Sequence, residues 1–165
     1  MTVAGKFAEF RSGIGWDVHR IAGGRPLILG GVTIPWNYGL EGHSDADILL
    51  HAVTDAVLGA AALGDIGMHF PDTDPKWKGA SSAQFLTHAT AMVRDLGFTL
   101  VNVDTTVILE APKLKEYRDA IRESLAKSLA LTVDRVSVKF KTAEAVGSVG
   151  RGFSAEAQAI VTIAR

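Results

Sequence analysis

Cysteine is absent from all 165 residues of the chain. This absence excludes disulfide bonds, thiolate nucleophiles and every zinc site that is built on sulfur ligands. A bound metal ion must therefore be held by histidine, aspartate or glutamate side chains. Long apolar runs are absent too, since none reaches the roughly 18 residues that a membrane-spanning helix needs. Residues 1–9 lack the apolar segment of a signal peptide, so we expect a soluble, cytoplasmic protein with no membrane partner.

A strong excess of charge is also missing. The formal net charge is −1, and no run of like charges occurs. A protein that binds nucleic acid through its phosphates normally carries a basic face, so we expect no nucleic-acid partner. Hydrophobic residues make up 47% of the chain and charged residues 21%, which is ordinary for a globular protein. The length suits a single domain, residues 1–165, with a substantial core.

Hydrophobic periodicity predicts alternating strands and helices. We expect strands at residues 10–19, 98–109, 136–142 and 154–163, and helices at 44–63, 81–97 and 114–130. The Gly30-Gly31 pair predicts a small hairpin between residues 27–29 and 32–34. Residues 36–42 and 65–81 are expected to be loops. This order predicts an α+β fold with a mixed four-stranded sheet, the hairpin, and helices on one face. The strands carry apolar residues on more than one side, so the other face is expected to be buried against another subunit.

The stretch His43–His51 contains two histidines and two aspartates. If a helix begins near Ser44, Asp47 and His51 are four residues apart and share one of its faces. Backbone N–H groups at a helix N-terminus favour anions, so a metal held by the histidine could bind a phosphate there. The alternative is an N-cap cluster with a purely structural histidine. The stretch by itself does not decide between these interpretations.

Asp17 and His19 provide further candidate ligands. They are two residues apart on a predicted strand, so their side chains point to the same face. With His51 they form a set of three ligands, which leaves the fourth tetrahedral position open as in catalytic zinc sites. Manganese or cobalt would also suit such a set. The alternative is a polar strand end that turns into the loop at residues 22–24.

Six segments of the chain resemble the 2-C-methyl-D-erythritol 2,4-cyclodiphosphate synthase family of the non-mevalonate isoprenoid pathway. They occur in the family's order and spacing from residue 10 onward. The segments are Gly15–His19, Gly42–Asp47 with His51, Ala61–Gly67, Phe70–Pro75, Ala111–Lys113 and Gly150–Gly152.

The resemblance implies a homotrimeric enzyme, a phosphorus–oxygen lyase, with active sites between adjacent subunits. The implied substrate is 4-diphosphocytidyl-2-C-methyl-D-erythritol 2-phosphate. Its 2-phosphate attacks the β-phosphorus of its own cytidine diphosphate group, CMP leaves, and a cyclic diphosphate forms. Because the nucleophile belongs to the substrate, no nucleophilic side chain is needed, and none is conspicuous in this sequence. The resemblance also implies a central trimer cavity that can hold an isoprenoid diphosphate.

The resemblance assigns roles to individual positions. Asp17, His19 and His51 match the zinc ligands, and Glu144 matches a carboxylate near a second ion, Mg²⁺ or Mn²⁺, that binds the substrate diphosphate. His43 and Thr142 match catalytic positions that stabilise the transition state. Positions matching substrate contacts are Asp17, Val18, His19, His43, Ser44, Asp65, Ile66, Gly67, Phe70, Pro71, Asp72, Thr73, Asp74, Leu109, Glu110, Ala111, Pro112, Lys113, Leu114, Lys115, Lys141, Thr142, Ala143, Glu144, Ser148 and Arg151. Of these, Asp65–Gly67 match the segment that holds the diol, Leu109–Lys115 the loop around the cytidine, and Ser148 and Arg151 the region near the central cavity.

Two other functions fit parts of the same pattern. One is a non-catalytic trimer that binds a nucleotide or an isoprenoid diphosphate as a sensor; it would keep the fold and lose the metal ligands. The other is a zinc hydrolase in which water attacks the diphosphate.

Overall fold

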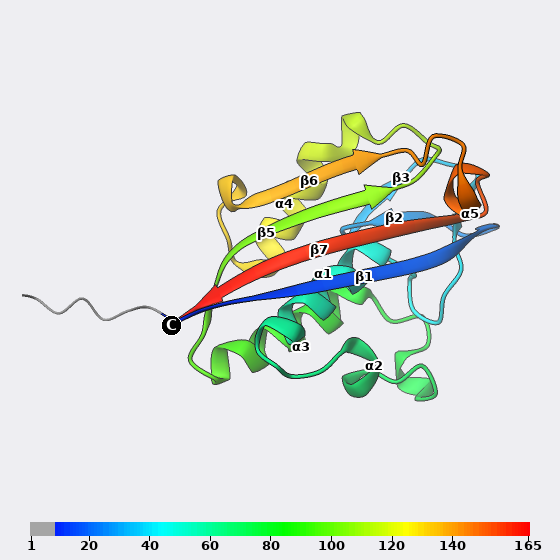
Figure 1. Ribbon diagram of the computed structural model, residues 1–165. Coiled ribbons are helices and arrows are strands. Elements are labelled where there is room, and N and C mark those ends of the chain that lie inside the picture. The colour runs from blue at the N-terminus through cyan, green and yellow to red at the C-terminus, as the bar shows by residue number, and fades with distance from the viewer. Residues whose placement is uncertain (1–8) are drawn as a thin grey trace, which may run out of the picture.

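A five-stranded sheet is the main layer of the computed structural model, which describes residues 9–165 (Figure 1). The expectation that no signal peptide occupies the first residues lies outside this range. The strands are β1 (Phe10–Gly23), β4 (Tyr38–Leu40), β5 (Thr99–Ile108), β6 (Val136–Lys141) and β7 (Ser154–Ala164). They are ordered β4-β1-β7-β5-β6. The β5–β6 pair is parallel and the other pairs are antiparallel, so the sheet is mixed as predicted.

The prediction of four strands was wrong because β4 lies in a segment expected to be a loop. β1 continues past His19, and its last residues pair antiparallel with β4, from Ile21 opposite Leu40 to Gly23 opposite Tyr38. A strand of three residues with a central glycine is too short to show the alternation that identifies strands in a sequence. Gly39 is needed there, because a Cβ atom would lie 2.4 Å from the carbonyl oxygen of Pro26.

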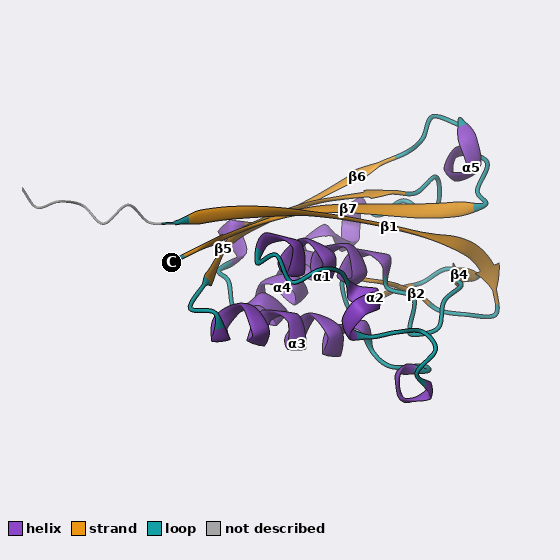
Figure 2. Cartoon of the chain, turned by 60° about the horizontal axis from the view of Figure 1, so that its bottom comes forward, coloured by secondary structure: helices purple, strands orange, loops and turns teal. Residues whose placement is uncertain are grey.

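Three long helices cover one face of the sheet (Figure 2). They are α1 (Ile48–Ala60), α3 (Ser82–Asp95) and α4 (Arg118–Leu129). Short helices α2 (Ile66–His69) and α5 (Gly147–Gly150) lie in connections, with 3₁₀ helices at Pro75–Trp77, Lys115–Tyr117 and Val133–Arg135. The hairpin β2 (Leu27–Leu29) and β3 (Val32–Ile34) forms the expected separate sheet. Within residues 9–165, no helix is long and apolar enough to cross a bilayer.

Several predicted boundaries needed correction. α1 begins at Ile48 rather than near Ser44, because Asp47 is its N-cap and accepts from the N–H of Leu50. The segment 65–81 is not one loop, since Asp65 and Asp74 cap α2 and the following 3₁₀ helix. The last predicted helix starts as a 3₁₀ turn and becomes α-helical only at Arg118.

Two glycines of β1 determine how closely α1 packs on the sheet. A Cβ atom on Gly13 would lie 2.1 Å from the carbonyl oxygen of Ala56, and one on Gly15 would lie 1.9 Å from that of Ala52. The helix backbone therefore packs directly against the strand, which only glycine allows at these two positions. This contact brings the N-terminal turn of α1, which carries His51, next to Asp17.

Candidate active site

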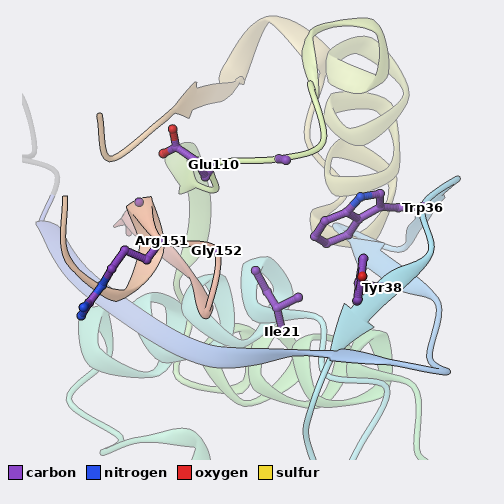
Figure 3. Close-up of a pocket in the computed structure, with 8 residues that line it drawn as sticks. Ile21, Trp36, Tyr38, Glu110, Arg151 and Gly152 are labelled. Atoms are coloured by element: carbon purple, nitrogen blue, oxygen red, sulfur yellow. The ribbon is translucent and has the colours of Figure 1, made fainter. Parts of the chain in front are cut away.

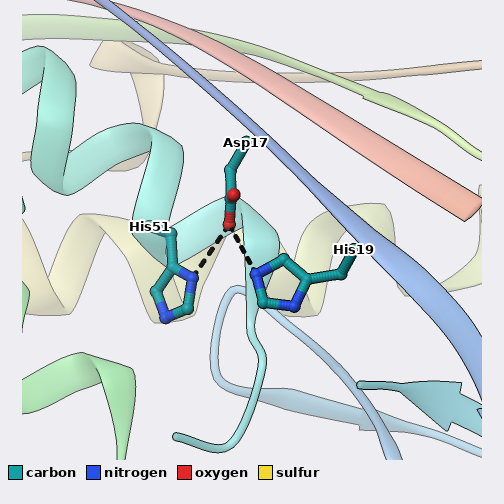
Figure 4. A group of neighbouring side chains, drawn as sticks. All are labelled: Asp17, His19 and His51. Carbon is teal, nitrogen blue, oxygen red and sulfur yellow. Dashed lines mark hydrogen bonds and ion pairs between the residues drawn. The ribbon is translucent and has the colours of Figure 1, made fainter. Parts of the chain in front are cut away.

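Asp17, His19 and His51 form a compact cluster between β1 and α1 (Figure 4). One carboxylate oxygen, Asp17 Oδ2, lies 3.0 Å from His19 Nε2 and 2.9 Å from His51 Nδ1. The three potential ligand atoms all lie within 4.8 Å of one another. Each side chain is partly buried, so an ion could reach the cluster from one side while the protein shields the other.

The strand and the helix bring these residues together for simple geometric reasons. Gly13, Gly15, Asp17 and His19 alternate along β1 and face α1. His51 is the fourth residue of α1, one residue before the Ala52 carbonyl that Gly15 accommodates. Close helix–strand packing thus places the imidazole beside the carboxylate.

Asp47 does not belong to this cluster. Its carboxylate is fully buried and accepts from the N–H groups of Leu50, Gly30 and Gly31, at 3.0, 2.9 and 2.7 Å. It therefore caps α1 and ties the hairpin turn to it. Of the two interpretations of His43–His51, capping applies to Asp47 and the ligand role remains open for His51.

The cluster is strongly polarised. Burial by itself raises the pKa of Asp17, but hydrogen bonds from His19 and His51 outweigh it and lower the pKa to about 2. Burial also opposes protonation of His19, yet the Asp17 carboxylate more than compensates and raises the pKa of that imidazole. The Asp17 carboxylate is therefore ionised at neutral pH, and a bound cation would pair with it.

Each histidine has a partner for its second ring nitrogen. His19 Nδ1 contacts the backbone carbonyl of Glu41, and His51 Nε2 lies 2.8 Å from Ser82 Oγ and 3.1 Å from Ser44 Oγ. Such outer contacts are typical of metal-binding histidines, because they fix the tautomer and the ring orientation. This donor set fits a divalent metal ion.

A cavity of about 630 Å³ opens beside the cluster. Its lining includes His19 and His51 together with a group of three aromatic side chains. The Phe70 and Phe85 rings stack with centroids 4.8 Å apart, and the Trp77 ring meets both edge-on. The remaining lining residues are Gly42, His43, Ser44, Ile66, Gly67, Pro71, Asp72 and Thr73.

A second, separate cavity of about 230 Å³ lies at the ends of β5 and β6. It shares no lining residue with the cavity beside Asp17, His19 and His51. Lys113, Lys115, Arg118 and Lys141 make it basic, so it suits an anionic group. The remaining lining residues are Leu109, Glu110, Pro112, Leu114, Phe140 and Thr142.

The loop after β6 is tied to the loop after β5. Ala143 donates its N–H to Glu110 Oε2 at 3.1 Å, and the Thr142 hydroxyl donates to Glu144 Oε1 at 2.6 Å. Glu144 and Ala145 both adopt the left-handed conformation, at φ 52° and 60°. Consecutive non-glycine residues in this region are unusual and often mark functional loops.

A third cavity, of about 390 Å³, lies where the end of β1 meets these loops. Figure 3 shows Trp36 and Tyr38 on one side and Glu110 and Arg151 on the other. Arg151 donates Nε–H to the carbonyl of Gly147 at 3.1 Å. Because Glu110 also lines the basic cavity, the two hollows adjoin at this residue.

Comparison with known proteins decides the family. A sequence model described as the YgbB family matches residues 10–164, nearly the whole described chain. The chain belongs to the YgbB family. A curated family relative from Solibacter usitatus (strain Ellin6076), named 2-C-methyl-D-erythritol 2,4-cyclodiphosphate synthase, is 68% identical over 94% of this chain and 98% of its own. This confirms the resemblance stated from the sequence.

Solved structures agree with the YgbB fold. A synthase structure described as the CDP-bound form is 42% identical, covers 92% of this chain and 98% of its own, and has a TM-score of 0.85. The bifunctional IspDF from Campylobacter jejuni matches with a TM-score of 0.92 and 43% identity. This chain, of which 95% is covered, spans only 42% of that longer protein.

The predicted site residues of this YgbB-family chain fall into separate places. The predicted metal ligands lie together with His43, Ser44, Ile66, Gly67 and Phe70–Thr73. Residues 109, 110, 112–115, 141 and 142 lie around the basic cavity, and Glu144 accepts a hydrogen bond from Thr142. Ala111 lines the third cavity instead. Ser148 lines another hollow with Val18, where its hydroxyl lies 2.8 Å from Ser154 Oγ. One chain therefore does not bring the whole predicted set together.

Some lining residues were missed from the sequence. Trp77 and Phe85 belong to the aromatic lining of the cavity beside Asp17, His19 and His51. Arg118 adds a positive charge to the basic cavity. Arg118 follows Lys115 by three residues, a helical spacing that places both on one side and could have identified it.

Proposed function

We propose that this YgbB-family chain converts 4-diphosphocytidyl-2-C-methyl-D-erythritol 2-phosphate to 2-C-methyl-D-erythritol 2,4-cyclodiphosphate and CMP. The observation that carries the proposal is the three-ligand cluster of Asp17, His19 and His51 at the wall of a large cavity. The relative that is 68% identical is named for this synthase, and a similar solved structure is described as CDP-bound.

Asp17 Oδ2, His19 Nε2 and His51 Nδ1 would hold the ion, and Zn²⁺ is the proposed occupant. Three protein ligands leave an open position for substrate oxygen. When bound, the ion offsets negative charge on a phosphate. Glu144 is proposed to hold Mg²⁺ or Mn²⁺ with the substrate diphosphate, because its exposed carboxylate lies beside the basic cavity.

The chain's own residues position and neutralise the substrate. An oxygen of the 2-phosphate forms a bond to the β-phosphorus, the bond from that phosphorus to the CMP oxygen breaks, and CMP leaves with the electron pair. His43 is proposed to donate a hydrogen bond to the phosphates as charge shifts between them. Thr142 is proposed to do the same once its hydroxyl turns from Glu144 to the substrate. Because both reacting groups belong to one molecule, holding them in line supplies much of the acceleration.

The substrate's other parts contact other segments. Asp65, Ile66 and Gly67 are proposed to hold the diol, and Phe70–Asp74 to close over it at the cavity wall. Leu109–Lys115 are proposed to surround the cytidine, with the basic side chains near its phosphate. Lys141 and Ala143 flank Thr142 in this arrangement.

A homotrimer would join the two halves of the site. The basic cavity and the metal cluster are separate within one chain, so the basic cavity of one subunit would face the metal cluster of the next. The sheet face opposite the helices supports this, since Ile14 is 73% exposed and Trp16 52% exposed on it. Large solvent-exposed apolar patches usually mark interaction surfaces, such as those between protein subunits.

The remaining proposals concern the whole molecule. Residues 1–165 act as one cyclodiphosphate synthase domain in the cytoplasm. An isoprenoid diphosphate binds the central cavity near Ser148 and Arg151.

Incubation with the substrate tests the proposal, with products resolved by ³¹P NMR. Cyclic diphosphate with one equivalent of CMP is the expected result. CMP with an open-chain diphosphate would instead show a hydrolase. Binding of CDP without turnover would show a non-catalytic sensor.

A further inference from the structure

A chain of hydrogen bonds leads away from the metal cluster through the second nitrogen of His51. His51 Nε2 lies 2.8 Å from Ser82 Oγ, and the Ser82 hydroxyl donates to Asp45 Oδ1. The Asp45 carboxylate also accepts the N–H of Ser82 at 3.0 Å and the N–H of Asp47 at 3.2 Å. Asp45 in the loop and Ser82 at the start of α3 are 37 positions apart in the sequence, yet they contact each other. Ser82 in turn contacts His51 of α1.

The direction of these bonds determines where the His51 proton lies. An ionised carboxylate only accepts hydrogen bonds, so Ser82 must give its proton to Asp45. The Ser82 oxygen then has a lone pair that faces His51 Nε2. A hydrogen bond forms between them when Nε2 carries the proton and donates it. Without an ion, Nδ1 donates a proton to Asp17 Oδ2, 2.9 Å away. An ion that replaces this proton would meet the Nδ1 lone pair, while the proton on Nε2 stays in place.

Burial makes this arrangement specific. The Ser82 side chain is fully buried, so no bulk water competes for its hydroxyl. Ser44 Oγ is a second neighbour of His51 Nε2, but at 3.1 Å it is farther away, and its nearest polar contacts are the Ser82 hydroxyl and the N–H of Ala46 rather than a carboxylate. Ser82 is therefore the stronger acceptor for the imidazole.

The loop that presents Asp45 is held from several sides. Arg25 donates to the carbonyls of Gly42 and Ser44, both at 2.8 Å. Ala46 adopts the left-handed conformation at φ 58°, which is energetically unfavourable for a residue with a Cβ atom. This turn directs Asp45 toward α3 and Asp47 toward the hairpin.

The two histidines are supported differently. His19 Nδ1 contacts a backbone carbonyl, that of Glu41, which no side-chain substitution removes. His51 depends on side chains, and each can be replaced. The contribution of outer contacts to metal binding can therefore be measured on one histidine while the other stays intact.

We propose that Ser82 and Asp45 are positioning residues that hold His51 with its proton on Nε2 and so present Nδ1 to the metal ion. This inference rests on the proposed metal site. It adds a role for two residues that touch neither the substrate nor the ion.

The test compares zinc affinities of metal-free proteins by competition with a chromophoric chelator. Ser82→Ala and Asp45→Asn are the variants. Thr54→Val is the matched control, because Thr54 carries a fully buried hydroxyl on α1, the helix of His51, and donates only to the Leu50 carbonyl. We expect zinc binding to weaken about tenfold in both variants and by less than about twofold in the control. Equal affinities for Ser82→Ala and Thr54→Val would overturn the proposal.

A spectroscopic measurement on the unaltered protein keeps the test independent of folding. In ¹⁵N-histidine-labelled, zinc-loaded protein, long-range ¹H–¹⁵N spectra should show His51 coordinated through Nδ1 with a slowly exchanging proton on Nε2. Coordination through Nε2 would overturn the proposal outright. If the unaltered protein fails to bind zinc at all, the metal site itself is refuted. Unchanged zinc binding in the two variants would refute only the positioning role.

Discussion

Replacing Gly15 by alanine should disrupt both the packing of α1 and the metal site. The added Cβ atom would lie 1.9 Å from the Ala52 carbonyl oxygen, whereas real Cβ atoms stay beyond 3.0 Å. The difference, 3.0 minus 1.9, means that helix and strand must separate by about 1 Å, well above the roughly 0.2 Å tolerance of metal–ligand distances. Because Asp17 lies on the strand and His51 on the helix, the cluster opens with the packing.

We expect Gly15→Ala to lower the free energy of unfolding by about 1–3 kcal/mol, the usual cost of overpacking. The zinc affinity should fall as well. Gly23→Ala is the matched control, since Gly23 lies on the same strand with nothing within 4 Å of its added Cβ. Its unfolding free energy should change by no more than about 0.5 kcal/mol.

The assay is urea unfolding of metal-free protein, followed by tryptophan fluorescence at one fixed protein concentration. Fixing the concentration matters because subunit association adds to apparent stability. Zinc affinity is measured on the same samples under native conditions. Equal stability and equal zinc affinity for the two alanine variants would refute the direct contact between α1 and β1.

Three further predictions address the metal and the assembly. His51→Ala should abolish zinc retention, measured by metal analysis, while the mass in light scattering stays unchanged; a variant that retains full zinc would contradict the ligand role. Zinc occupancy should fall as pH drops through the histidine range, because protons compete for both imidazoles and the carboxylate raises the pKa of His19; equilibrium dialysis that finds full occupancy near pH 4 would contradict the ligand set. Ile14→Asp should shift the mass in light scattering toward the monomer, because it places a charge on the bare apolar sheet face; an unchanged oligomer would show that this face is not the interface.

The sequence predicted those parts of the fold that depend on local pattern. Alternation identified the long strands, and the Gly30-Gly31 pair indicated the hairpin turn. The short strand β4 was missed because three residues carry no periodic signal. The start of α1 was misplaced because Ser44, Asp45 and Asp47 are all good N-cap residues, and only the buried contacts of Asp47 distinguish them.

The group of Asp17, His19 and His51 could be predicted because both of its parts depend on spacing within one element. Asp17 and His19 follow the two-residue period of a strand, and His51 follows the start of a helix. The contact between Asp45 and Ser82 could not, because it depends on how α1 and α3 pack. The sequence also could not predict that residues 109–115 lie apart from Asp17, His19 and His51, because residue order does not say which loops share a cavity.

The central claim is that the Asp17, His19 and His51 cluster binds the ion on which cyclisation depends. The most direct test is CMP release by metal-free protein as zinc is added in known proportion, with Mg²⁺ constant. The account predicts negligible release without zinc and a rise that saturates at one zinc per chain. Undiminished CMP release from the metal-free protein would contradict it.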